Sequence, residues 1–239
     1  MKPIDIIITT WKRESFIKEC LKSIKENTTY PHRITLIWNE GKESDIEDIR
    51  KEIDNIVVLK DNWGLEPAKN IGMSFVKSKY FISTDNDCLP MQPNENGDWL
   101  SQLIKLMDNN PEYGAISCRT QVMIGTGNIF DGKEDQNIVE FPHPGGSLRI
   151  MKRDLVNKIG GWRSDVNSRG QEEKYICGKI NEMGFKTGFA TKIKCWHMFG
   201  DGNWGYGDMK PEEHGHNPVW HPAIENGDDL EERKKWIGY

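Results

Sequence analysis

An apolar run at residues 80–84 stops abruptly at two carboxylates, Asp85 and Asp87, with Asn86 between them. The run has the length and composition of a buried strand. In an open α/β sheet, ligands collect beyond the carboxyl ends of the strands. A strand that ends in this way delivers hard oxygen ligands, which suit Mg²⁺ or Mn²⁺. Asp and Asn also form turns by bonding their own backbone, so the stretch alone leaves a metal site and an ordinary turn both open.

The preceding residues alternate between strand-like and helix-like patterns. Apolar or β-branched runs lie at residues 4–9, 34–38 and 56–59, and helical patterns lie at residues 15–24, 45–53 and 67–76. Ser15 is a candidate cap of the first helix, and Pro67 suits a first helical residue. This alternation predicts a parallel sheet with crossover helices, in which residues 80–84 form the fourth strand.

The second half of the chain predicts further strands and helices before its composition changes. Strands are expected at residues 113–117, 145–150, 185–190 and 193–197, and helices at residues 98–107, 152–159 and 171–183. Asp98 is a candidate cap of the first of these helices. Residues 125–137 have the Gly, Asn and Asp content of a loop. From residue 199 onward Gly, Trp and His dominate, which we interpret as a tail that packs on or over the functional site.

The bulk composition fits a globular chain and excludes some partners. Charged residues make up 29% and hydrophobic residues 36% of the sequence, a balance typical of folded proteins. The formal net charge of −5 argues against a nucleic-acid partner, which favours a basic footprint. No apolar run is long enough to span a bilayer, and the N-terminus lacks a signal-peptide pattern. The five scattered cysteines predict buried thiols in a reducing compartment, and hence a cytoplasmic protein.

Eight short segments follow one another in a specific order. They are TTWKR at 9–13, LKSI at 21–24, NWG at 62–64, AKNIG at 68–72, STDND at 83–87, GGW at 160–162, QEE at 171–173 and WH at 196–197. In this order they resemble the family 2 glycosyltransferases, and the resemblance spans residues 4–197. It implies a single α/β domain at residues 1–198 with the A-type (GT-A) fold: a Rossmann-like, mostly parallel central sheet flanked by helices. Residues 1–97 would bind the nucleotide sugar, residues 98–198 would bind the acceptor and carry catalysis, and residues 199–239 would form the tail.

The resemblance implies roles for the two aspartates. Asp87 would bind a divalent ion, Mn²⁺ or Mg²⁺, directly, while Asp85 lies beside it and faces the sugar or ribose. His197 would complete the metal shell; the alternative is an ordinary, partly buried histidine at a strand end. The ion would act as the Lewis acid that stabilises the departing diphosphate.

The resemblance also implies a carboxylate general base. Glu172 and Glu173 stand where the family has its acidic pair, and Glu173 takes the position of the base. An aspartate is usual there, so either glutamate remains a candidate. Acidic residues are favoured in a first helical turn by the helix dipole alone, so one of the two can have only that role.

The remaining expected contacts concern the donor and the acceptor. Residues expected at the nucleotide sugar are Thr9, Thr10, Arg13, Asn39, Lys69, Asn70, Asp85 and Asn86. A UDP-sugar is favoured, but Asn39 replaces the aspartate that commonly bonds uracil, so a GDP-sugar stays open. For Lys69 and Asn70, the alternative is a position at a solvated helix start. Trp162 and Trp204 are candidates for contacting an acceptor, a glycan or another hydroxyl compound, and core packing is their alternative role.

The resemblance therefore implies an inverting, metal-dependent glycosyltransferase that transfers a hexose. A nucleotidyltransferase is less favoured, because residues 10–14 contain no glycine for a phosphate loop. A non-catalytic, metal-dependent sugar- or nucleotide-binding module is another alternative, although Leu89 breaks the EF-hand pattern. A zinc site in the tail would use Cys195, His197, His214, His216 and His221, whose spacing is looser than structural zinc sites show.

Overall fold

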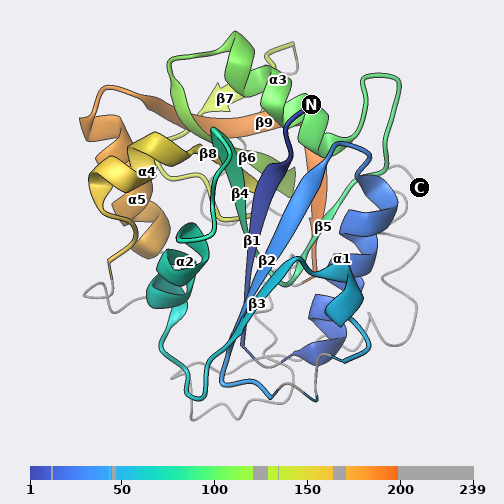
Figure 1. The fold of residues 1–239 in the computed structure, drawn as a ribbon. Coiled ribbons are helices and arrows are strands. Elements are labelled where there is room, and N and C mark those ends of the chain that lie inside the picture. Colours follow the sequence, from blue (N-terminus) through green and yellow to red (C-terminus); the bar gives the residue numbers. More distant parts are fainter. Residues whose placement is uncertain are drawn as a thin grey trace.

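The computed structural model describes residues 1–11, 13–42, 44, 47–120, 129–133, 135–163 and 171–198. The strands are β1 (Ile4–Trp11), β2 (His32–Asn39), β3 (Asn55–Val58), β4 (Tyr80–Asp85), β5 (Cys88–Pro90), β6 (Tyr113–Thr120), β7 (Ile138–Glu140), β8 (Arg149–Lys152) and β9 (Lys186–His197). The helices are α1 (Glu14–Asn27), the 3₁₀ helix η2 (Arg50–Glu52), α2 (Leu65–Met73), α3 (Trp99–Asn109), α4 (Arg153–Ile159) and α5 (Gln171–Glu182). The strands form one sheet in the order β3-β2-β1-β4-β8-β6-β9-β5, and β7 pairs with β9 beside this path (Figure 1).

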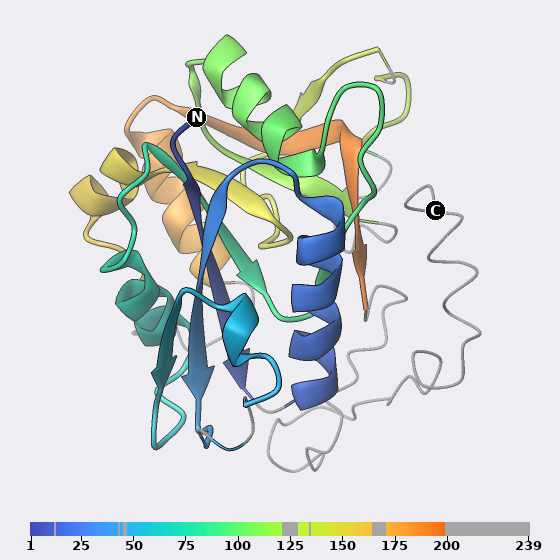
Figure 2. The same cartoon turned by 45° about the vertical axis from the view of Figure 1, so that its right-hand side comes forward.

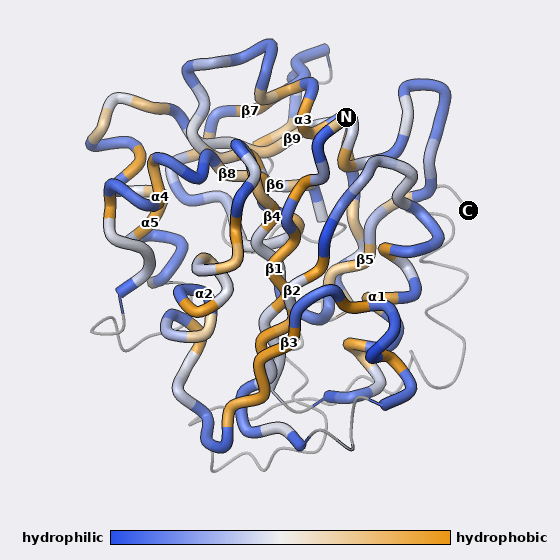
Figure 3. The backbone as a smooth tube through the Cα atoms, viewed as in Figure 1, coloured by the Kyte–Doolittle hydropathy of each residue, from blue (hydrophilic) through white to orange (hydrophobic). Residues whose placement is uncertain are grey.

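The half of the sheet built from β3, β2, β1 and β4 is parallel throughout, as the sequence predicts. Its central strands are apolar on both faces because helices cover both, and Figure 3 shows the hydrophobic residues gathered along them. Ile6, Ile7 and Ile8 of β1 have no exposed surface. The carboxyl ends of these strands therefore meet at one edge, which is where the site forms.

Beyond β4 the sheet is mixed. β8 runs antiparallel to both β4 and β6, and β9 is parallel to β6 but antiparallel to β5 and β7. The predicted α/β fold with a helix-flanked central sheet is confirmed, with its parallel character confined to the first half and to the β6–β9 pair.

Two cores lie on opposite faces of the sheet. One contains the apolar side chains of α1 and α3, and the other contains those of α4 and α5, against which Met73 of α2 packs. Figures 1 and 2 show α1 on one side of the parallel strands and α2 on the other. The sheet is therefore the middle layer of three.

Some local predictions are confirmed and others are wrong. Asp98 caps α3, since its Oδ1 accepts a hydrogen bond from the Ser101 amide at 2.7 Å. Ser15 does not cap α1, because the helix already begins at Glu14, directly after Arg13 in the left-handed conformation (φ 60°).

Three predicted segments differ from the structure. Within the described part of residues 45–53, the expected helix is reduced to the 3₁₀ turn η2. The two strands expected at residues 185–197 form one long strand, β9, and the strand expected at residues 145–150 begins only at Arg149. The short strands β5 and β7 were not predicted, because three residues are too few to show a period.

The cysteines are all free and buried, as predicted. Across the described ranges, no helix combines the length and apolar character needed to cross a membrane.

Candidate active site

Residues from the ends of β1 and β4 are joined by hydrogen bonds at the carboxyl edge. Thr9 and Asp85 are register partners, and the Thr9 hydroxyl donates to Asp85 Oδ1 at 3.2 Å. The amide of Asn86 donates to the Thr10 hydroxyl at 2.7 Å. These contacts bring together four of the residues that the sequence predicts at the donor, and they fix the start of the turn that carries Asp87.

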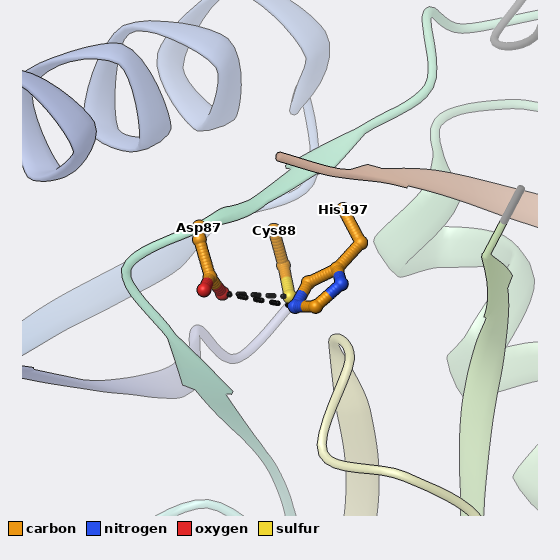
Figure 4. Close-up of side chains that lie close together, drawn as sticks. All are labelled: Asp87, Cys88 and His197. Carbon is orange, nitrogen blue, oxygen red and sulfur yellow. Dashed lines mark hydrogen bonds and ion pairs between the residues drawn. The ribbon is translucent and has the colours of Figure 1, made fainter. Parts of the chain in front are cut away.

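Asp87 and His197 meet because β5 pairs with the end of β9. Cys88 and His197 are register partners in this antiparallel ladder, and His197 Nε2 lies 3.5 Å from Asp87 Oδ1 (Figure 4). Arg13 Nη1 lies 3.3 Å from Asp87 Oδ2. Although burial acts in the opposite direction, His197 and Arg13 hold the pKa of Asp87 below its ordinary value. Burial likewise opposes a charged His197, but Asp87 and Asp85 raise the pKa of its imidazole.

This pair has the donor chemistry for a divalent cation. Figure 4 shows the side chains of Asp87, Cys88 and His197 converging, and their ligand atoms lie within 4.8 Å of one another. A carboxylate and an imidazole suit Mn²⁺, and a carboxylate suits Mg²⁺. Burial raises the pKa of the Cys88 thiol well above its ordinary value, with Asp87 as a further cause, so that its sulfur is a neutral neighbour of the pair.

Asp85 lies on the other side of the same turn, facing a buried lysine. Lys69 of α2 is 1% exposed, and its Nζ lies 3.8 Å from Asp85 Oδ1. Burial alone would lower the pKa of Lys69, but Asp85, Glu172 and Glu173 raise it, so the lysine is charged. Asp85 keeps 35% of its side chain exposed, which leaves it open to a ligand.

The two glutamates at the start of α5 have different environments. Burial, followed by the negative charge of Glu173, raises the pKa of Glu172 to about 8. Burial also acts to raise the pKa of Glu173, but Lys69 and Arg149 outweigh it and hold that pKa below its ordinary value. At neutral pH, Glu172 is therefore protonated and Glu173 is ionised, which is the state a general base requires.

Gly146 marks the point at which the charged groups converge. A Cβ placed on this residue would lie 3.2 Å from Glu173 Oε1, 3.7 Å from Asp85 Oδ2 and 3.9 Å from Lys69 Nζ. These three polar groups therefore converge beside the Gly146 backbone, at a point that we call the gap. Sequence reasoning did not identify Gly146; its GG pair before a strand was the only available signal.

Arg149 is the second residue that sequence reasoning missed. It belongs to β8, has no exposed surface, and lies close enough to Glu173 to influence its pKa. Its signal in the sequence was a single cation inside the apolar run at residues 148–151.

Asn39 holds the loop that follows β3. Its Nδ2 donates to the Gly64 carbonyl at 3.1 Å, and its Oδ1 accepts from the Trp63 amide at 3.2 Å. Asn39 is buried, whereas Trp63 is 59% exposed. Asn39 therefore shapes the loop beside the ends of β1 and β2, and each end of its amide keeps one further hydrogen-bonding position.

Asn70 and Trp162 are bound to each other and not to the charged gap. Asn70 Nδ2 donates to the Trp162 carbonyl at 2.7 Å, and Asn70 Oδ1 accepts from the Trp162 amide at 2.8 Å. The Trp162 ring is 2% exposed and packs edge-on against Phe81, so it has almost no surface to offer an acceptor. Trp204 lies outside the described residues.

Comparisons with known proteins show a family match. The model of glycosyl transferase family 2 matches residues 5–167. The glycosyltransferase GlyA of Streptococcus pneumoniae serotype 4 is 23% identical over 205 residues, covering 76% of this chain and 27% of that protein. The chain thus spans about a quarter of the length of this curated relative.

Two solved structures illustrate the similarity of fold. The mannosyltransferase PcManGT of Pyrobaculum calidifontis, in complex with GDP-Man and Mn²⁺, superposes with a TM-score of 0.67 at 20% identity, covering 83% of this chain and 57% of that chain. TarS residues 1–349 of S. aureus, in complex with UDP-GlcNAc, gives a TM-score of 0.62 at 13% identity, covering 89% and 63%. At these identities the likeness establishes the GT-A fold alone.

Proposed function

The chain belongs to glycosyl transferase family 2, and on that premise we propose that it transfers a sugar from a nucleotide-diphosphate sugar to an acceptor hydroxyl. One observation carries the proposal: Asp87 and His197, which could bind a metal, lie at the same sheet edge as Asp85, Lys69 and Glu173 around Gly146. A metal-and-diphosphate region next to an ionised carboxylate is the arrangement that glycosyl transfer requires.

Asp87 and His197 would hold Mn²⁺ or Mg²⁺, with Asp85 beside them. When bound, the cation stabilises the negative charge that develops on the departing diphosphate. Arg13 adds a protein cation next to Asp87, at 3.3 Å. The hydrogen bonds from Thr9 to Asp85 and from Asn86 to Thr10 hold the turn in place, so the carboxylates need not reorganise when the donor arrives.

Glu173 would accept the proton of the attacking hydroxyl. It is ionised because Lys69 and Arg149 outweigh its burial, whereas Glu172 is neutral and serves as its hydrogen-bonding neighbour. A single base and one displacement give inversion at the anomeric carbon, and a hexose is the sugar we expect. Asp85 Oδ2 and Glu173 Oε1 both face the gap at Gly146, where the reacting sugar would lie.

The solved neighbours and Asn39 indicate which donors to expect. A UDP-sugar is the first candidate and a GDP-sugar the second, since the solved neighbours include a complex of each kind and Asn39 offers both a donor and an acceptor to a base. The acceptor would be a glycan or another hydroxyl compound. The five free, buried thiols fit the reducing environment of the cytoplasm.

A thermal-shift screen with UDP, GDP and their sugars, each with and without Mn²⁺, tests the proposal. Ligands that bind the native state raise its melting temperature, so the expected result is a shift with one nucleotide diphosphate that grows with Mn²⁺. Product analysis then separates the rivals: a glycosyltransferase releases nucleoside diphosphate from the donor, and a nucleotidyltransferase, supplied with a nucleoside triphosphate and a sugar 1-phosphate, releases pyrophosphate. The absence of any Mn²⁺-dependent shift and of nucleoside diphosphate release across the panel would refute the proposal.

A further inference from the structure

Arg149 is a buried cation with an incomplete set of hydrogen bonds. Its side chain has no exposed surface. Nη1 donates to the Pro144 carbonyl at 3.1 Å and lies 3.8 Å from Cys177 Sγ. Within the described part of the chain, Nε and Nη2 have no hydrogen-bond partner. Buried polar groups are nearly always paired, so an arginine in this state calls for an explanation.

The two contacts of Arg149 join the elements that frame Glu173. Cys177 stands four residues after Glu173 on α5, so both side chains lie on the same face of that helix. Pro144 begins the segment that leads to Gly146, where an added Cβ would lie 3.2 Å from Glu173 Oε1. The guanidinium therefore ties the Gly146 segment on one side and the Glu173 face of α5 on the other.

A charge at this depth must be balanced by another charge. An isolated buried cation is strongly unfavourable unless an opposite charge is close. The charged and titratable groups around Glu173 are Lys69 from α2, Asp85 from β4, Arg149 from β8, and Glu172 and Cys177 from α5. Lys69 is already paired with Asp85, at 3.8 Å. Glu172 is protonated, so Glu173 is the one ionised carboxylate among these groups that is left to balance Arg149.

We propose that Arg149 is a positioning residue for Glu173: its buried guanidinium fastens the Pro144–Gly146 segment to α5 and provides the cation against which the Glu173 carboxylate is held facing the gap. The proposal rests on the proposed function for the role of Glu173 as base. Lys69 pairs with Asp85 and, together with Arg149, also favours the ionised form of Glu173.

Replacement of the cation tests this role. Arg149→Met and Arg149→Gln remove the charge, Arg149→Lys retains it, and Arg153→Met is the matched control at the start of α4, where Arg153 contacts Asp154 and the Lys77 carbonyl. Removing one member of a buried charge pair destabilises the fold, so urea denaturation first shows which variants are folded at the assay temperature, and the glutamine variant provides a second neutral side chain.

The neutral variants should lower kcat by about tenfold or more, the cost of a small misplacement, while the KM for the donor changes less than about twofold. The acid limb of the kcat–pH profile should move up by about 1 pH unit, since a neighbouring cation lowers a carboxyl pKa by at least that much. Arg149→Lys should restore the position of the limb, and Arg153→Met should leave it in place. An acid limb that does not move in either neutral variant would overturn the proposal.

A second measurement does not depend on turnover. In protein labelled with ¹³C at the Glu side-chain carboxyl, the Glu173 resonance is assigned by its loss in Glu173→Gln and titrated by NMR. Its titration midpoint should rise in both neutral variants and return with lysine. An unchanged midpoint overturns the role of Arg149, whatever the enzyme transfers. A raised midpoint in a protein that turns over no donor would refute the proposed function and leave the link between Arg149 and Glu173 intact.

Discussion

The carboxylate of Asp87 lies 3.5 Å from the imidazole of His197, which connects the turn after β4 to the end of β9. The connection depends on the short ladder in which Cys88 faces His197 and Pro90 faces Cys195. Residues 1–97 contribute one member of the pair and residues 98–198 the other. The candidate metal site is therefore assembled only when both halves of the sheet have formed.

Removal of divalent cations should abolish transfer. The pair of Asp87 and His197 carries too little net positive charge to stabilise a departing diphosphate without a metal ion. We therefore expect turnover to fall at least about 100-fold in excess chelator and to return with Mn²⁺ or Mg²⁺. Asp87→Asn should require far more Mn²⁺ for half-maximal activity, because an amide is a weaker ligand. Asp154→Asn, an exposed change on α4 with 76% of the side chain accessible, is the control. Full activity in chelator would exclude a metal-dependent mechanism.

Glu173→Gln should impair the chemical step and spare donor binding. A general base contributes roughly 10²–10⁴-fold to rate, so kcat should fall within that range, while the dissociation constant of the nucleotide changes little. Glu182→Gln, at the far end of α5 with 65% of its side chain exposed, is the matched control. If Glu172→Gln causes the larger loss, the base is the first glutamate of the pair and our assignment is off by one.

The parallel half of the sheet and the acidic turn were predictable because their signals are local. The isoleucines of β1 and the apolar run ending at Asp85 follow the strand period within a few residues of the chain. The environment of Arg149 was not predictable, because it is formed by Pro144 and by Cys177 of α5, and no local pattern links them. The different protonation of Glu172 and Glu173 also arises from tertiary neighbours, namely Lys69 and Arg149.

Glu172→Gln should stabilise the protein at alkaline pH. In the folded chain burial raises the pKa of Glu172 to about 8, whereas an unperturbed glutamate has a pKa of 4.5. Between these values the unfolded chain releases a proton that the folded chain retains, so the wild type loses stability as pH rises through this window and levels off above it. Glutamine does not titrate, so the variant escapes this loss.

The difference in unfolding free energy between Glu172→Gln and wild type should therefore grow from pH 5 to pH 8.5, by more than about 1 kcal/mol, since one pKa unit corresponds to 1.36 kcal/mol. Urea denaturation at both pH values measures it, with Glu182→Gln as the control that should show no such growth. A difference that is constant with pH would mean that Glu172 is ionised in the folded protein.

Asn39→Asp tests whether this position reads the base or holds the loop. The family commonly has aspartate here, so a base-reading role alone predicts that the variant stays stable and binds UDP at least as well as wild type. In this fold, however, Asn39 Nδ2 donates to the Gly64 carbonyl at 3.1 Å. An aspartate would place a carboxylate oxygen against that carbonyl, and losing a buried hydrogen bond in this way costs about 1–3 kcal/mol.

We therefore expect Asn39→Asp to unfold at lower urea concentration and to bind both UDP and GDP more weakly, because the Trp63–Gly64 loop loses its attachment. Asn181→Asp is the control: its Nδ2 also donates to a carbonyl, that of Pro142 at 3.0 Å, but at an exposed site, where water can replace the lost bond. Calorimetry with the two nucleotides separates the roles. A weaker affinity for both bases means that the loop is held by Asn39, and a gain for UDP alone means that the side chain contacts the base and that the loop is held by other groups.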